Sequence, residues 1–106
     1  MADPTRKKSV HISMIIREHR NACKKHTKFC DALIDESKVA WAETELRIKA
    51  KNSKPPYYAD CILMEEVADA FEAISAGDKE HAKQELAQVC AVCLRIMDEL
   101  DKEKNK

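Results

Sequence analysis

Residues 62–100 read ILMEEVADAFEAISAGDKEHAKQELAQVCAVCLRIMDEL, and this stretch decides the fold class. Apolar residues recur in it every three or four positions, which is the period of an amphipathic helix. The pattern is interrupted at Gly77-Asp78, where a glycine suits the end of one helix and an aspartate suits the N-cap of the next. The sequence therefore predicts two antiparallel helices joined by a tight turn at Gly77.

Two further helical patterns precede this hairpin. One runs from about Ser9 to the high twenties, and the other begins near Val39 and ends before Pro55-Pro56. Each proline lacks an amide donor and disfavours helix at the residue before it. Only one glycine and three prolines occur in 106 residues, which also favours helix. We expect an all-α, four-helix bundle with a C-terminal antiparallel helical hairpin.

The size and charge of the chain narrow its function classes. We expect a single helical domain over residues 1–106, with residues 1–8 and 101–106 as frayed tails. Such a small domain buries a limited core, so we also expect a homodimer or homotetramer. Lys+Arg and Asp+Glu each total 19, and this zero net charge argues neither for nucleic acid nor for an anionic membrane. Because no apolar run has the length of a signal peptide or a membrane span, we expect a soluble, cytoplasmic protein.

Cysteines and histidines give no clear metal-binding or redox signature. The five cysteines fall at apolar helical positions, which predicts reduced cysteines in the core. Cys90-x-x-Cys93 looks like half of a zinc site or a redox pair, but no second Cys/His pair has a matching spacing. We therefore interpret both residues as core, and we assign no role to His11, His19, His26 or His81.

Acidic residues are placed symmetrically about the predicted turn. Glu66 and Asp69 are three positions apart, as are Glu85 and Gln88, so each pair shares a helix face. Gly77 lies midway between positions 69 and 85, and also midway between positions 66 and 88. Antiparallel helices therefore bring Asp69 opposite Glu85 and Glu66 opposite Gln88. We expect the Asp69 and Glu85 carboxylates to lie within about 8 Å, a distance that one hydrated divalent ion spans.

Converging carboxylates on a half-buried face repel each other unless a cation joins them. Oxygen ligands of this kind suit Mg²⁺ or Mn²⁺, which also bridge to phosphate oxygens. The alternative is a solvated acidic face without a metal, in which Glu85 pairs with Lys79 or Lys83.

The runs LMEEVADA (63–70) and QELAQV (84–89) resemble the MazG-like, all-α nucleoside triphosphate pyrophosphohydrolases, and the second run is similar to a phage-associated branch. The likeness covers residues 57–100. That family carries Glu-Glu-x-x-Glu on one helix and Glu-x-x-Asp on the next, and it uses Mg²⁺ to cleave an NTP to NMP and pyrophosphate. The resemblance implies a MazG-like bundle with catalytic residues Glu65 and Glu66 and with metal ligands Glu66, Asp69, Glu85 and Gln88.

This chain departs from the family pattern at two of these positions. Asp69 is shorter than the usual glutamate, and Gln88 supplies a neutral carbonyl oxygen where the family has an aspartate. The missing charge at Gln88 should weaken a metal site and puts turnover in doubt. Phosphates also need cations, and the substrate-binding candidates are Lys54, Arg47, Lys51 and Lys83, with Arg17 and Arg20 as others and Trp41 as a base-stacking residue. Each of these is more often a surface charge or, for Trp41, part of a core or interface.

Three functions therefore compete. The first is a Mg²⁺- or Mn²⁺-dependent pyrophosphohydrolase that acts on an NTP or dNTP. The second is a catalytically weakened or non-catalytic nucleotide- or protein-binding module of the same fold. The third is a small DNA- or protein-binding adaptor that uses the basic N-terminal helix.

Overall fold

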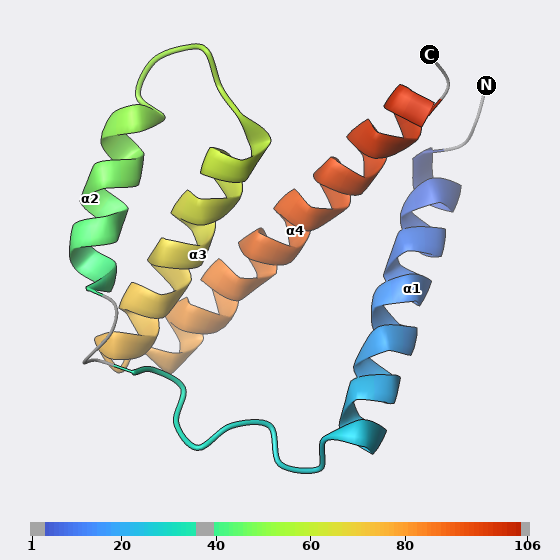
Figure 1. Ribbon diagram of the computed structural model, residues 1–106, viewed down its shortest axis with the longest axis horizontal. Helices are drawn as coiled ribbons and strands as arrows, with labels where there is room; N and C mark the ends of the chain where they lie inside the picture. The colour runs from blue at the N-terminus through green and yellow to red at the C-terminus, as the bar shows by residue number, and fades with distance from the viewer. Residues whose placement is uncertain (1–3, 36–39, 105–106) are drawn as a thin grey trace. The chain divides into compact units, whose positions relative to one another are not determined.

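The computed structural model describes residues 4–35 and 40–104, and within them it has four α-helices and no strand (Figure 1). This confirms the all-α prediction. The helices extend into both segments expected to fray, because the first begins at Pro4 and the last ends at Lys104. The four helices are α1 Pro4–Lys25, α2 Trp41–Lys51, α3 Ala59–Ser75 and α4 Lys79–Lys104.

The chain divides into two compact units. One unit comprises α1 and the residues up to Asp31, together with α4 from Leu94 onward. The other runs from Ala32 to Cys93 and so contains α2, α3 and the first part of α4. The four-helix bundle and the oligomer remain predictions.

The turn between α3 and α4 is the one predicted at Gly77-Asp78. Gly77 has φ +81°, a left-handed conformation that glycine adopts without steric cost. The Gly77 amide donates to the Ile74 carbonyl at 3.0 Å and the Asp78 amide donates to the Ala73 carbonyl at 3.2 Å, which together form a Schellman motif. Asp78 then caps α4, since its Oδ1 accepts the His81 amide at 3.1 Å. The chain reverses here and α4 runs back from the end of α3 (Figure 1).

Small residues form most of the buried core. Ala68, Ala70 and Ala73 on α3 and Ala82 on α4 are the buried apolar residues within the described ranges. Beside them, the Trp41 ring of α2 stacks on Phe71 of α3 with centroids 4.8 Å apart. This stack fixes which face of α2 meets α3, and it thereby sets which polar side chains of α2 lie near the acidic face of α3.

The prediction of core cysteines was wrong for this chain. Cys23, Cys30 and Cys90 are exposed, Cys61 and Cys93 are half-buried, and all five are free thiols. The cysteines within the helices do lie on apolar helix faces, as the periodicity indicates. These faces are wider than the small alanine core, so the cysteines that lie outside the core are not buried. Across residues 4–35 and 40–104, no helix is long and apolar enough to cross a membrane.

Candidate metal centre between α2, α3 and α4

A hollow of about 430 Å³ lies between α2, α3 and the start of α4, within a single compact unit. Carboxylates dominate its lining, with one lysine and one histidine among them. The lining residues are Glu45, Lys49, Asp69, Glu72, Ala73, Ala76, Asp78, His81 and Glu85. Asp69 and Glu85 therefore line one hollow from two different helices, while the expected distance of about 8 Å between their carboxylates stays a prediction.

The acidic face of α3 gathers three carboxylates. Glu65, Glu66 and Asp69 each offer an oxygen, and these three oxygens all lie within 4.8 Å of one another. Asn52, which follows α2, donates from Nδ2 to Glu65 Oε1 at 3.1 Å and to the Cys61 carbonyl at 3.1 Å. Asn52 thus holds the Glu65 carboxylate in place from outside the helix.

Two buried carboxylate oxygens, Glu66 Oε2 and Glu85 Oε2, have no hydrogen-bond partner among the residues that the structure describes. The other oxygen of Glu85, Oε1, lies 3.0 Å from Nε2 of His81 one turn earlier. Burial raises the pKa of Glu66, and the nearby charges of Glu85 and Glu65 raise it further. Buried polar atoms are normally paired, and a cation held between α3 and α4 would pair both of these oxygens.

Lys49 of α2 bridges two acids of this hollow. Its Nζ lies 2.8 Å from Glu45 Oε1 and 3.4 Å from Asp69 Oδ1. The hydrogen bond to Glu45 raises the pKa of Lys49. A hydrogen bond from Glu72, followed by that from Lys49, lowers the pKa of Glu45 to about 2. The lysine ammonium therefore supplies the local positive charge that keeps the Glu45 carboxylate ionised.

The pKa of Asp69 is shifted in the opposite direction to that of Glu45. Burial is the largest cause and the hydrogen bond to Glu45 the next, and together they raise the pKa of Asp69 to about 6. Glu72 also has a raised pKa, chiefly because of its hydrogen bond with Glu45. Glu45 therefore stays ionised while the pKa values of its two acidic neighbours, Glu72 and Asp69, are raised, as expected for carboxylates placed too close to ionise independently.

The sequence analysis did not single out Glu45 or Lys49 as site residues. Glu45 lies on the apolar face of α2, between Trp41 and Ile48. An acid on an apolar helix face is unusual, and this signal could have identified Glu45 as a candidate site residue. Lys49 follows it by one turn on the same face. The Trp41–Phe71 stack, which brings this face of α2 against α3, is a tertiary contact that periodicity does not reveal.

Of the predicted site residues that the structure describes, Asp69 and Glu85 line the hollow, whereas Glu65, Glu66 and the remaining ligands and cations are not among its lining residues. Gln88 is exposed on α4 and is not among the lining residues within the described ranges, so its role as a ligand stays a prediction. Lys83 lies 3.4 Å from Glu80, and the Lys51 ammonium lies 5.6 Å from the Tyr58 ring centroid. Arg47 and Lys54 are exposed, while Trp41 has one ring face against Phe71. The exposed Arg17 and Arg20 belong to α1 in the other unit.

Comparison with known proteins finds no matching family model, no matching curated protein and no matching solved structure.

Proposed function

We propose that this chain is a Mg²⁺- or Mn²⁺-dependent nucleoside triphosphate pyrophosphohydrolase of the MazG-like, all-α type, and that the acidic hollow together with the adjoining acidic face of α3 forms its metal and substrate site. The observation that carries the proposal is the pair of buried, unpartnered oxygens Glu66 Oε2 and Glu85 Oε2 on two facing helices. Oxygen-only ligands of this kind are those that Mg²⁺ and Mn²⁺ prefer.

Glu66, Asp69 and Glu85 would hold the ion, with Gln88 as a further predicted ligand from the surface of α4. A bound ion of this class neutralises phosphate charge and lowers the pKa of a water that it binds. Glu65, oriented by the 3.1 Å hydrogen bond from Asn52, is placed to accept a proton from an attacking water. The metal ligand Glu66 and the base Glu65 would then be adjacent on one helix.

Lys49 gains a second role in this proposal. Its ammonium lies against Glu45 and Asp69. If Asp69 served as a metal ligand, the flexible Lys49 side chain would be available to contact a substrate phosphate instead. Lys49 thereby joins the predicted phosphate contacts Arg47, Lys51, Lys54 and Lys83, while Trp41 keeps its proposed place beside the base.

The second candidate function is a nucleotide-binding module without turnover. The observation that favours it is the exposure of Gln88, where the family has an aspartate ligand. A site that lacks this charge binds a divalent ion more weakly, since fewer anionic ligands offset the loss of the ion's hydration shell. In this case the hollow would bind metal and nucleotide while hydrolysis is slow or absent.

The proposed assembly is a homodimer or homotetramer in the cytoplasm. Large apolar side chains are exposed on this chain, including Leu46 at 72% and Leu86 at 41% exposure. Apolar patches of this kind mark protein–protein contacts. A nucleotide substrate and five free thiols both fit a cytoplasmic location.

A pyrophosphate-release assay over NTPs and dNTPs, with Mg²⁺ or Mn²⁺, tests the enzyme. We expect metal-dependent release by the parent chain, and its loss in Glu66→Gln and Glu85→Gln. Glu80→Gln is the matched control, because Glu80 is exposed on the same helix as Glu85 and outside the hollow. Metal-dependent thermal stabilisation without pyrophosphate release identifies the binding module instead. If neither occurs, the hollow is a solvated acidic face and both proposals fail.

A further inference from the structure

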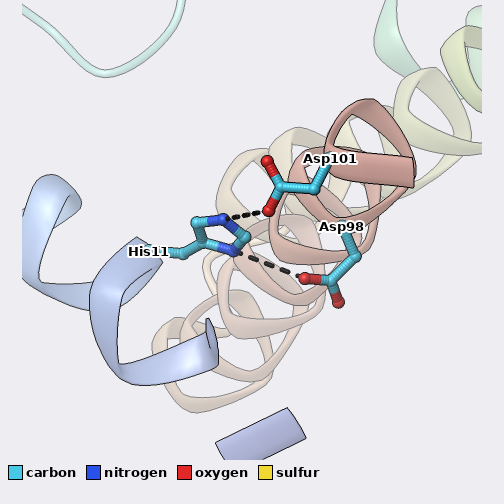
Figure 2. Close-up of side chains that lie close together, drawn as sticks. All are labelled: His11, Asp98 and Asp101. Atoms are coloured by element: carbon cyan, nitrogen blue, oxygen red, sulfur yellow. Dashed lines mark hydrogen bonds and ion pairs between the residues drawn. The ribbon is translucent and has the colours of Figure 1, made fainter. Parts of the chain in front are cut away.

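His11 is the only buried polar or charged residue in the part of the chain whose burial the structure describes, with 7% of its surface exposed. It lies on α1 and its imidazole faces α4 within the same compact unit. Figure 2 shows the ring directed toward Asp98 and Asp101, which are one helical turn apart and present their carboxylates to it. His11 and Asp101 are 90 positions apart in sequence, so the cluster joins the N-terminal and C-terminal helices.

Both ring nitrogens face carboxylate oxygens, but they are not equally satisfied. Nε2 lies 3.1 Å from Asp101 Oδ2 in a hydrogen bond, whereas Nδ1 lies 3.4 Å from Asp98 Oδ1. Nδ1 is buried and has no hydrogen-bond partner among the described residues. The imidazole is nine-tenths buried and directed at the two carboxylates, and its Nδ1 makes an ion pair but no hydrogen bond; this is an observation independent of the acidic pair itself.

We propose that His11, Asp98 and Asp101 form a binding site for a divalent transition-metal ion of the zinc class. One imidazole nitrogen and one oxygen from each aspartate supply three ligands, and water completes the shell. Imidazole nitrogen with carboxylate oxygen is a donor set that suits Zn²⁺, Co²⁺ and Ni²⁺, whereas Mg²⁺ prefers oxygen alone. The three side chains are together anionic whether or not the imidazole is protonated, which favours a cation.

The two aspartates face different ring nitrogens, so the site requires one carboxylate to turn toward the nitrogen that holds the ion. One ligand atom from each residue lies within 4.8 Å of the others. Zn–N and Zn–O bonds of about 2.0–2.2 Å in a tetrahedral shell place ligand atoms roughly 3.3–3.5 Å apart. The His11 side chain is 9% exposed and fixed by its surroundings, while the Asp98 and Asp101 side chains are 33% and 40% exposed. Rotation of the two aspartates therefore closes the shell from the solvent side.

The consequence of such a site is structural. An ion held by α1 and by the C-terminal part of α4 links two segments that are far apart in sequence, and it stabilises their packing by mass action. This role does not depend on the nucleotide site, because its donor set differs from the all-oxygen hollow. The two sites are therefore separable by the choice of metal.

Calorimetric titration of Zn²⁺ into the full chain, in buffer with excess Mg²⁺ to occupy the all-oxygen hollow, tests the site. We expect one Zn²⁺ per chain and a rise in the thermal midpoint. Asp98→Asn, Asp101→Asn and His11→Gln should each weaken Zn²⁺ binding by at least about tenfold. Glu99→Gln is the matched control, since Glu99 is exposed on the same turn of α4 and bonds Lys102 instead.

Thiols also bind Zn²⁺, and Cys23 Sγ lies 3.6 Å from His19 Nε2. If the ion is bound by His11, Asp98 and Asp101, Cys23→Ser and the double variant Cys90→Ser/Cys93→Ser should leave the Zn²⁺ titration unchanged. Bound Co²⁺ should then show no sulfur charge-transfer absorption. The two aspartate variants keep the histidine and are isosteric, so they decide the matter if His11→Gln fails to fold. Absence of Zn²⁺ binding in the parent, equal binding in both aspartate variants, or its loss in a cysteine variant overturns the proposal and leaves an ion-pair clamp only.

The failure of this site and the failure of the nucleotide site are distinguishable. Glu66→Gln should lose Mg²⁺-dependent pyrophosphate release and keep Zn²⁺ binding. Asp98→Asn should keep Mg²⁺-dependent pyrophosphate release and lose Zn²⁺ binding.

Discussion

At the scale of single residues, the hollow combines carboxyl groups whose pKa values move in opposite directions. Lys49 and Glu72 hold Glu45 ionised, with a pKa of about 2, while burial and Glu45 together raise the pKa of Asp69 to about 6. Sites that perform acid–base or metal chemistry commonly separate the pKa values of neighbouring carboxyls in this way. The arrangement leaves Asp69 as the acid that changes its charge in the mildly acidic range.

The pH dependence of folding follows from these two shifts. The folded chain binds more protons than the unfolded chain between the ordinary pKa of Asp69, 3.8, and its folded value of about 6, so this group's contribution to stability falls as pH rises through that window. Glu45 acts oppositely: its contribution is present above its ordinary pKa of 4.5 and is lost as pH falls toward 2. In urea unfolding across this range, the free energy of unfolding of the parent should fall as pH rises, by an amount on the order of 1 kcal/mol. In Asp69→Asn this fall should be absent. Identical slopes in the two chains would contradict the raised pKa of Asp69.

In the proposed metal site, Lys49 would compete with the divalent ion for Asp69, because its ammonium lies 3.4 Å from that carboxylate. Lys49→Met should therefore lower the stability of the metal-free chain, since Glu45 and Asp69 then repel without compensation. The same variant should show a larger rise in thermal midpoint with Mg²⁺ or Mn²⁺ than the parent. Lys51→Met is the control, because Lys51 lies over the Tyr58 ring outside the hollow. A metal response equal to that of the parent would show that Lys49 does not compete for the site.

At the scale of helices, the sequence predicted what local chemistry determines. The turn at Gly77-Asp78 follows from the conformational freedom of glycine and the capping ability of aspartate, and both predictions are confirmed. The contribution of α2 to the hollow could not be predicted in this way, because it depends on the Trp41–Phe71 stack. His11 was missed for the same reason: its partners are 87 and 90 positions away, on a helix whose packing partner the periodicity does not specify.

The α3–α4 turn gives a test at this scale. Gly77→Ala should reduce the free energy of unfolding by about 1–2 kcal/mol, since an L-residue is strained at φ +81°. A Cβ at this position meets nothing within 4 Å, so the loss is conformational and not steric. Gly77→Asn should cost less, because asparagine tolerates the left-handed region. Urea denaturation that ranks the asparagine variant below the alanine variant would rule out a left-handed conformation as the source of the loss.

At the scale of the whole molecule, α1 carries apolar residues on two sides. Val10 and Met14 are one turn apart, as are Ile12 and Ile16, and all four are between 42% and 57% exposed. A helix that is apolar on more than one face is normally buried within a larger structure. These side chains are therefore where we expect a second copy of the chain to pack if the proposed oligomer forms.

The predicted oligomer can be tested through this helix. Light scattering at micromolar concentration should give a multiple of the 12.1 kDa chain mass, because covering apolar surface of this extent stabilises association. Ile16→Lys should shift the mass toward a single chain, since it places a charge where the partner packs. Ser13→Lys adds the same charge at a polar, exposed position of α1 and is the control for charge alone. The assembly should also lose thermal stability on dilution, as mass action requires. A single-chain mass at micromolar concentration, together with a thermal midpoint that does not change on dilution, would rule out the homo-oligomer and leave the apolar faces of α1 to another partner.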